Sequence, residues 1–397
     1  MRPKRILPAI VFSQFAGTSL WFAGNAIIAD LGTAMNVGID DIGIATSAVQ
    51  FGFITGTLLF ALLSISDRYS PRKLFLLCSV LGAISNLLLY FIAYNLFSLL
   101  VLRFITGFFL TGIYPIGMKI ASGWYKKGLG NAIGLLVGAL VLGTAFPHLI
   151  KSFGRSVPWE LVIYIISAFS LVGGLIMYLF VPDGPNISSG TKFNPKAIVT
   201  IFKSRELRSS ALGYFGHMWE LYTFWALIPV ILIYYSKLNP AQLNISFWSF
   251  IIIASGFLGC VLGGVISKRI GSAKVAFFQL LLSGICCLIS PIMFYTPITV
   301  FLFFLIFWGI VVVGDSPQYS AIIALSAPRE LVGSGLTLIN SIGFAITILS
   351  LWFVYQFLDI INISYALMIL GIGPILGLIS MKNLLLNKYQ TVFYFLH

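Results

Sequence analysis

The sequence predicts an all-α membrane protein with twelve transmembrane helices in two pseudo-symmetric halves of six. The first observation behind this prediction is the composition, because 59% of the 397 residues are hydrophobic and only 9% are charged. A soluble domain of this length could not cover so much apolar surface with polar groups. The other two observations are a series of long apolar stretches and two motifs that recur at nearly one offset along the chain.

The apolar stretches are each long enough to cross the hydrocarbon core of a bilayer, which needs about 20 helical residues. Each is expected to be a helix, since lipid offers no partner for unpaired backbone groups. The first stretch follows a basic N-terminus but is too long for a signal-peptide core, so we expect a permanent span. The twelve predicted spans are residues 8–31, 43–65, 74–94, 97–121, 130–151, 159–181, 210–234, 245–267, 275–295, 298–325, 332–356 and 360–381.

The basic residues are distributed unevenly between the two sides of the predicted spans. With the N-terminus in the cytoplasm, the outer segments contain only Lys151, Arg155 and Lys237, and Arg103 lies inside a span. The other twenty of the 24 Lys and Arg residues then belong to inner segments. The positive-inside rule therefore predicts a multi-pass protein of the inner membrane with both termini in the cytoplasm.

One long connection separates the first six spans from the last six. Residues 182–209 are rich in Gly, Pro, Ser and basic residues, a composition typical of a linker. The expected domains are an N-terminal half at 1–181, this cytoplasmic linker, a C-terminal half at 210–382 and a cytoplasmic tail at 383–397. Alternating apolar and basic residues inside the linker favour either an amphipathic helix on the inner membrane face or a simple tether.

Two motifs recur in corresponding places in the two halves. DRYS at 67–70, after the second span, matches KRIG at 268–271 after the eighth, an offset of 201. GIYP at 112–115 matches GDSP at 314–317, an offset of 202. Two matches at nearly one offset indicate an internal duplication about an axis along the membrane normal. A substrate is then expected to bind between the two halves near the middle of the membrane.

With these features the whole chain resembles the major facilitator superfamily. The loop LSISDRYSPRK at 63–73 is similar to the family's G-x-L-x-D-R-x-G-R-R, although Leu63 and Ser70 replace its two glycines. The copy GVISKRIGSAK at 264–274 keeps both glycines, Gly264 and Gly271, and the basic Arg269 and Lys274, but has Lys268 in place of the acid. The resemblance implies the major facilitator fold, transport of a small molecule and function as a monomer. The G-P-x-x-G-G signature of many drug and proton antiporters is absent from the fifth span, which disfavours an exporter.

The seventh span, GYFGHMWELYTFW, contains the first titratable residues that we single out. His217 and Glu220 are three residues apart on one helix face, roughly 14 and 18 Å beyond Arg208 at about 1.5 Å per residue. A charge at this depth costs several kcal/mol, so a chain that keeps one usually uses it. We expect Glu220 to carry a proton, with His217 as its assistant. The alternative is that both residues only form hydrogen bonds across a helix contact.

The tenth span, VVVGDSPQYSA at 311–321, contains the second acid. Asp315 and Gln318 share a face, and Pro317 removes a backbone hydrogen bond and permits a kink. We expect Asp315 to be either a second proton site or a ligand for a cationic group on the substrate. The alternative is a kink in which Asp315 only satisfies neighbouring backbone groups.

Arg103 in the fourth span is too deep to be an ordinary flanking charge. Its planar fork suits a carboxylate, so it is expected either to bind an anionic substrate or to hold an acid and tune its proton affinity. The sequence Arg103-x-x-x-Gly107 is also similar to a superfamily pattern that is often linked to proton coupling.

Uncharged polar and aromatic residues inside the spans are candidates for the lining of a substrate cavity. Such groups orient a small ligand through a few hydrogen bonds and stacking surfaces, although each can equally fill a helix contact. The predicted substrate-binding residues, besides Arg103 and Gln318, are Gln14, Trp21, Asn25, Gln50, Tyr114, Tyr222 and Asn340.

Charged residues at the cytoplasmic helix ends are candidates for a gate. They can pair with one another and with helix C-termini in one state and separate in another, or they can simply anchor the inner ends of the helices. The predicted gating residues are Asp67, Arg68, Arg72, Lys73 and Arg269.

We predict a secondary active transporter that moves a small polar metabolite by alternating access, with proton-coupled symport of an organic anion favoured. The nearest alternative is a proton antiporter that exports drugs or hydrophobic cations; a non-transporting membrane sensor is a further one. The sequence contains neither H-E-x-x-H nor G-x-S-x-G, which argues against an enzyme. No cofactor, metal or nucleic-acid partner is expected; the partners are the substrate, protons and the lipid bilayer.

Overall fold

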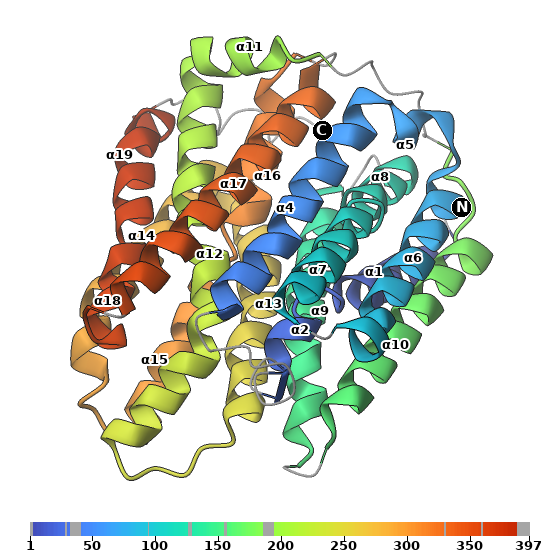
Figure 1. Ribbon diagram of the computed structural model, residues 1–397. Helices are drawn as coiled ribbons and strands as arrows, with labels where there is room; N and C mark the ends of the chain where they lie inside the picture. The colour runs from blue at the N-terminus through green and yellow to red at the C-terminus, as the bar shows by residue number, and fades with distance from the viewer. Residues whose placement is uncertain are drawn as a thin grey trace. The chain divides into compact units, whose positions relative to one another are not determined.

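The computed structural model describes residues 3–27, 30–31, 41–93, 95–125, 129–154, 157–185, 194–328, 331–358 and 360–386 (Figure 1). These residues form helices, turns and loops, without a strand among them. Eleven helical segments of this described part are long and apolar enough to cross a membrane, and a shorter apolar helix precedes them. The chain divides into two compact units, one of Met1–Lys192 with Leu243–Ala254 and one of Phe193–Gln242 with Ser255–His397.

Unit 1 contains the first set of spans. Within it α1 packs against α9 and α10, α4 against α7, and α6 against both α7 and α10. Its helices are α1 (Ile6–Thr18), α2 (Ala23–Ala26), α4 (Asp41–Leu62), α5 (Ile65–Arg68), α6 (Pro71–Ile92), α7 (Leu96–Leu110), α8 (Tyr114–Trp124), α9 (Leu129–Ser152) and α10 (Trp159–Phe180).

Unit 2 is built around α12, which packs against α16, α17 and α19. The helix α13 belongs to both units, since its residues up to Ala254 group with unit 1. The remaining helices are α11 (Ala197–Lys203), α12 (Arg205–Leu238), α13 (Ile245–Ile270), α14 (Ser272–Met293), α15 (Ile298–Val311), α16 (Ser316–Ser326), α17 (Val332–Leu358), α18 (Ile363–Leu370) and α19 (Ile372–Leu386).

Several predicted continuous spans are interrupted. The span predicted at 97–121 is the pair α7 and α8, and the span predicted at 298–325 is the pair α15 and α16. Pro115 and Pro317 lie in the first turn of the second helix of each pair, where the missing proline N–H breaks no helical hydrogen bond. The recurring motifs GIYP and GDSP therefore lie at corresponding helix breaks, while the division of the chain at 182 and 210 stays a prediction.

The segment predicted as a linker is partly helical. Its residues 197–203 form α11, and α12 already begins at Arg205, with the Ser204 side chain accepting a hydrogen bond from the Leu207 N–H at its start. Ile201 is 2% exposed and lies against Gly335 of α17. This short helix is thus packed on unit 2 rather than being a plain tether.

Glycines allow the helices of unit 1 to approach closely. A Cβ atom on Gly52 of α4 would lie 2.0 Å from the Phe104 carbonyl oxygen of α7. A Cβ atom on Gly107 of α7 would lie 2.0 Å from the Val49 carbonyl oxygen of α4. Only glycine fits at these two positions, which bring the backbones of α4 and α7 into contact.

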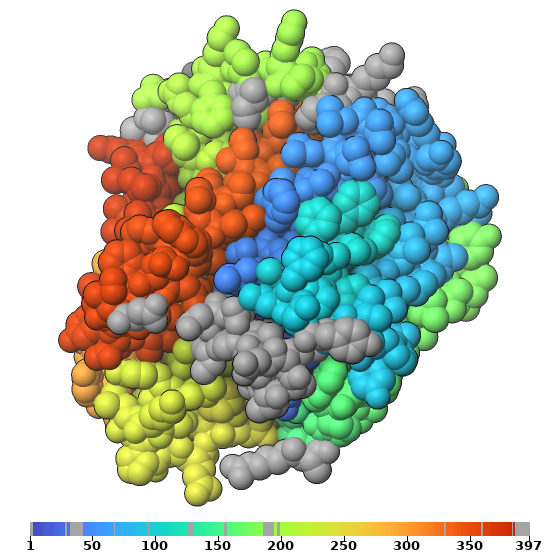
Figure 2. Space-filling model, viewed as in Figure 1, coloured from blue at the N-terminus to red at the C-terminus, as the bar shows by residue number. Residues whose placement is uncertain are grey.

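Large apolar side chains lie on the outside of the helices, as a lipid-facing surface requires. On α17, which Figure 2 shows at the molecular surface in orange-red, Leu349 is 58% and Trp352 is 62% exposed. The polar side chains of the spans are instead mostly buried. The polar and titratable side chains that could bind a substrate or a proton therefore lie on the buried faces of the helices.

Candidate functional site

The helix α12 presents two titratable residues on its buried face. His217 and Glu220 are each 1% exposed, and they lie far from either end of this 34-residue helix. The three-residue spacing places both side chains on the same side of the helix. As the sequence predicts, unit 2 thus contains an imidazole and a carboxyl group well inside a membrane span.

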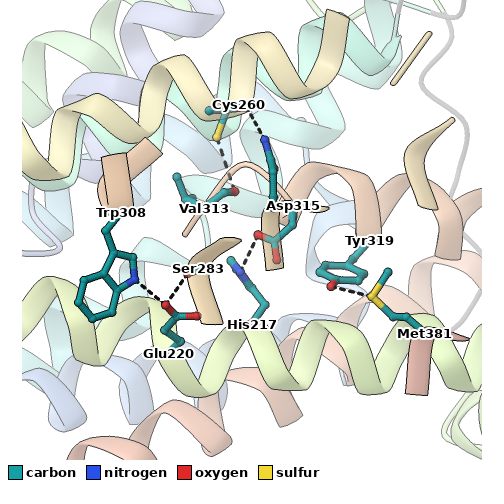
Figure 3. Close-up of polar contacts among 11 residues, drawn as sticks. His217, Glu220, Cys260, Ser283, Trp308, Val313, Asp315, Tyr319 and Met381 are labelled. Atoms are coloured by element: carbon teal, nitrogen blue, oxygen red, sulfur yellow. Dashed lines mark hydrogen bonds and ion pairs between the residues drawn. The ribbon is translucent and has the colours of Figure 1, made fainter. Parts of the chain in front are cut away.

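Three side chains donate hydrogen bonds to one oxygen of Glu220, its Oε1. They are the Ser283 hydroxyl, the Trp308 indole N–H at 2.7 Å and the Cys287 thiol at 3.3 Å. Figure 3 shows two of these bonds, those from Ser283 and Trp308. Ser283 and Cys287 come from α14, and Trp308 comes from α15. In all three hydrogen bonds Oε1 of Glu220 is the acceptor, so these bonds stabilise a form of the carboxyl group in which Oε1 carries no proton.

The imidazole of His217 forms an ion-pair contact with Asp315. The His217 Nδ1 atom lies 2.8 Å from Asp315 Oδ1, and Asp315 is also 1% exposed. The contact is close but is not aligned as a hydrogen bond, and both His217 Nε2 and Asp315 Oδ2 are without a hydrogen-bond partner. Asp315 immediately precedes α16, so the break between α15 and α16 is what turns its side chain toward α12.

Aromatic rings surround the His217 side of this cluster. The ring centroids of Tyr214 and Tyr319 lie 5.8 and 6.3 Å from the imidazole centroid. The Tyr319 hydroxyl donates to the Met381 sulfur at 3.1 Å (Figure 3). We call His217, Glu220 and Asp315 the unit 2 acid–imidazole cluster. It combines two buried carboxyl groups with one imidazole, which is a set of groups able to hold and exchange protons.

Arg103 of α7 is completely buried in unit 1. Its Nη1 donates to the Leu20 carbonyl oxygen at 3.2 Å, and its Nη2 donates to the Trp21 carbonyl oxygen. These carbonyls lie in the interruption between α1 and α2, so the guanidinium group stabilises the end of α1. Among the described residues no carboxylate pairs with Arg103, and its Nε has no hydrogen-bond partner.

Several predicted substrate-binding residues of unit 1 gather near the same interruption. The Trp21 ring lies 6.4 Å from that of Tyr114, between centroids, and the Asn25 amide donates to the Thr46 hydroxyl at 2.7 Å. Gln50 lies one helical turn after Thr46 and is fully buried, with neither amide atom hydrogen-bonded. Gln14, one turn before Thr18, is buried without a partner in the same way.

The predicted substrate-binding residues of unit 2 have different surroundings. Tyr222 is buried between Trp225 and Phe344, with ring centroids 5.2 and 5.3 Å away. Gln318 is 3% exposed in the first turn of α16, and Asn340 is half-buried on α17. Gln318 lies three residues after Asp315 of the acid–imidazole cluster, and Tyr222 lies two residues after Glu220.

The predicted gating residues are found at helix ends. Arg72 lies 3.9 Å from the Asp183 carboxylate, and the Ser70 hydroxyl donates to both oxygens of that carboxylate at 3.0 and 2.9 Å. Arg68, Lys73 and Arg269 are exposed. The side chain of Asp67 lies outside the described part of the structure.

The family model of the Major Facilitator Superfamily matches residues 7–351. The chain belongs to this superfamily. A solved structure, that of the major facilitator superfamily proton:xylose symporter XylE bound to 6-bromo-6-deoxy-D-glucose, matches with a TM-score of 0.73 and 14% identity over 95% of each chain. No curated protein gives a significant sequence match.

Membership of the major facilitator superfamily confirms the resemblance and the helical membrane fold that the sequence predicts. It also identifies the chain as a multi-pass membrane transporter. At 14% identity the likeness to XylE establishes the fold alone. The substrate, the coupling ion and the individual site residues therefore stay predictions.

Sequence reasoning missed the residues that hold Glu220 in this superfamily member. Ser283, Cys287 and Trp308 lie in apolar runs, where nothing distinguishes them from core residues. The only available signal was the presence of a hydroxyl and an indole N–H inside spans, because buried polar atoms need partners. Their common partner becomes visible only once α12, α14 and α15 are packed together.

No group of three metal-ligating residues occurs in the described ranges of the chain. The four cysteines, Cys78, Cys260, Cys286 and Cys287, are buried and free. Within the described residues, the buried acidic, basic and imidazole side chains of the spans are those of the acid–imidazole cluster, Arg103 and His148 of α9.

Proposed function

We propose that this protein is a secondary transporter that moves a small polar metabolite by alternating access, driven by protons in symport. The observation that carries the proposal is the unit 2 acid–imidazole cluster, in which His217 contacts Asp315 and shares a helix face with Glu220. Two acids and one imidazole, each 1% exposed, are costly in a membrane span unless they are used.

Protonation of this cluster changes its net charge, which gives a physical basis for coupling. A charged site resists removal from water, whereas a neutralised one can be enclosed at a lower cost in free energy. Binding of protons can therefore favour one conformation of the transporter over another. The similar fold of a protein described as a proton:xylose symporter agrees with this mechanism at the level of the fold.

An organic anion is the substrate class that Arg103 favours. The guanidinium is fully buried without a carboxylate partner among the described residues, and its Nε has no hydrogen-bond acceptor. The two backbone carbonyls of Leu20 and Trp21 do not neutralise the positive charge of Arg103, so an incoming anion would gain from its field. The unpaired amide of Gln50 adds a neutral donor and acceptor in the same unit.

The membrane orientation follows the charge distribution of the sequence. The excess of basic residues in the segments assigned to the inside supports an inner-membrane protein with both termini cytoplasmic. We further propose that the chain works as a monomer, with halves at 1–181 and 210–382 that move about the linker at 182–209. Arg68, Arg72, Lys73 and Arg269 then form the charged part of the inner gate.

The experiment uses purified protein in liposomes that contain a pH-sensitive dye. Organic anions, neutral sugars and hydrophobic cations are added in turn to the outside, and the internal pH is recorded without an imposed gradient. We expect some organic anions to cause internal acidification with the native protein. Glu220→Gln and Asp315→Asn should abolish it, whereas Glu160→Gln, at the start of α10, should not.

Other outcomes decide between the alternatives. Internal acidification on addition of a neutral sugar would support proton symport and would contradict the proposal that the substrate is an organic anion. Internal alkalinisation on addition of a hydrophobic cation would instead establish antiport, for which the ring cluster of Tyr222, Trp225 and Phe344 is suited. Solute uptake, measured by mass, without any proton movement would reject proton coupling.

A further inference from the structure

We infer that Trp308 is a positioning residue that fixes the proton of Glu220 on Oε2, on the side of the carboxyl group that faces His217. The inference rests on the proposed function, in which Glu220 carries a proton. Its starting point is the convergence of three donors on the other oxygen, Oε1. The side chains concerned have no role in the sequence-based prediction.

The chemistry of the donors restricts where the proton can bind. A hydroxyl or thiol can turn and accept a hydrogen bond, but an indole N–H can only donate. If Oε1 of Glu220 carried the proton, it would become the weakly accepting hydroxyl oxygen of the acid while Trp308 Nε1 still pointed at it from 2.7 Å. A proton on Oε2 leaves Oε1 as the carbonyl oxygen, which accepts all three bonds.

The indole cannot easily move away from this position. Trp308 is fully buried, and its ring stacks on Phe224 with centroids 4.3 Å apart and planes 25° from parallel. Phe224 is one helical turn after Glu220 on α12, so Trp308 contacts the same helix through both its ring face and its N–H. Phe304, with its centroid 5.6 Å away, packs against it from its own helix.

The free oxygen lies toward the rest of the cluster. In Figure 3 the second carboxyl oxygen of Glu220 points to the side on which His217 and Asp315 are drawn, and the three-residue spacing agrees with this. His217 uses Nδ1 for Asp315 and leaves Nε2 without a hydrogen-bond partner. The other titratable groups near Glu220, among the described residues, are Asp315, Cys286 and Cys287.

The inferred proton transfer runs from Oε2 of Glu220 to Nε2 of His217. The Oε2–H bond of Glu220 breaks and an Nε2–H bond forms on His217, which leaves a carboxylate and an imidazolium. The carboxylate is stabilised by the three donors on Oε1, and the imidazolium by the Asp315 carboxylate 2.8 Å from Nδ1. Trp308 therefore acts through Glu220 and does not itself exchange the proton.

The test is infrared difference spectroscopy of purified protein in lipid, recorded between acid and alkaline pH. The C=O stretching band of the protonated Glu220 is identified by its loss in Glu220→Gln. In Trp308→Phe we expect this band to shift to higher frequency, because its carbonyl oxygen loses a hydrogen bond. Ser283→Ala should shift it in the same direction, and Trp352→Phe, at an exposed position of α17, should leave it unchanged.

The outcomes separate this inference from the proposed function, since no substrate is needed. If neither Trp308→Phe nor Ser283→Ala shifted the frequency of the Glu220 band, the inference would be overturned. The role of Glu220 as a proton carrier would be unaffected by that result. Absence of a Glu220 band at every pH at which the protein is folded would reject the carrier itself. If Trp308→Phe does not fold, as judged by circular dichroism, the shift in Ser283→Ala decides the question.

Discussion

The Nδ1 atom of His217 and the Oδ1 atom of Asp315 lie 2.8 Å apart, with each residue 1% exposed. The two residues come from α12 and from the break before α16, so their contact links two spans that are far apart in the sequence. Burying a pair of this kind costs free energy, because both groups lose their contact with water. Removing one partner also costs free energy, because the other group is then buried without its partner.

We therefore expect His217→Gln and Asp315→Asn each to lower the free energy of unfolding by about 3–5 kcal/mol. The double variant should lose less than the sum of the two single losses, since the second substitution removes a group already without its partner. Unfolding by sodium dodecyl sulfate in mixed micelles measures these values. Additive losses would show that the two side chains do not interact in the folded protein.

Arg103 supports the interruption between α1 and α2 through the Leu20 and Trp21 carbonyls. Arg103→Met leaves both carbonyls without this donor and should destabilise the protein by about 1–3 kcal/mol for each. Arg103→Lys should recover only part of this loss, because one ammonium group does not reproduce the two-pronged geometry.

The control for Arg103 is Arg208→Lys in α12. Arg208 is exposed and donates to the Phe202 carbonyl oxygen at 3.0 Å, so its replacement should change the unfolding free energy by less than about 1 kcal/mol. Thermal unfolding in detergent compares the two sites. If Arg103→Lys and Arg208→Lys lowered the unfolding temperature equally, the structural role of Arg103 would be contradicted.

Gly107 allows α7 to touch α4, since a Cβ atom there would lie 2.0 Å from the Val49 carbonyl oxygen. Gly107→Ala should separate the two helices and sharply reduce the yield of folded protein in size-exclusion chromatography. Gly264→Ala on α13 is the matched control, because an added Cβ atom there meets no atom within 4 Å. A well-folded Gly107→Ala protein would mean that α4 and α7 can move apart without cost.

The Asp183 carboxylate accepts hydrogen bonds from Ser70 and lies 3.9 Å from Arg72. Both charged side chains are partly exposed, at 32% for Arg72 and 42% for Asp183, so solvent and salt screen the pair. Asp183→Asn should reduce the unfolding free energy by no more than about 1 kcal/mol. A much larger loss, or one that persists in concentrated salt, would show that this contact holds the fold together.

The sequence could predict those site residues that stand out within their own span. It could not predict those whose role depends on a contact with another helix. His217, Glu220 and Asp315 stand out because a titratable residue within an apolar run is visible without a structure. Ser283 and Trp308 do not stand out, because a serine or a tryptophan within a span has many ordinary uses. Arg103 was identified as deep and polar, but its carbonyl partners belong to another helix.

The sequence by itself determined the class of protein and most of its helices. Hydropathy is a local property, and a span of about 20 apolar residues is forced into a helix because lipid leaves its backbone groups no other partner. The recurring GIYP and GDSP motifs marked the places where two of these helices break. Tertiary structure alone decided which side chains meet, including the contact of His217 with Asp315 and the three donors on Glu220. The reason is that the rotation of each helix about its axis depends on side-chain packing against its neighbours, which no single segment of sequence contains.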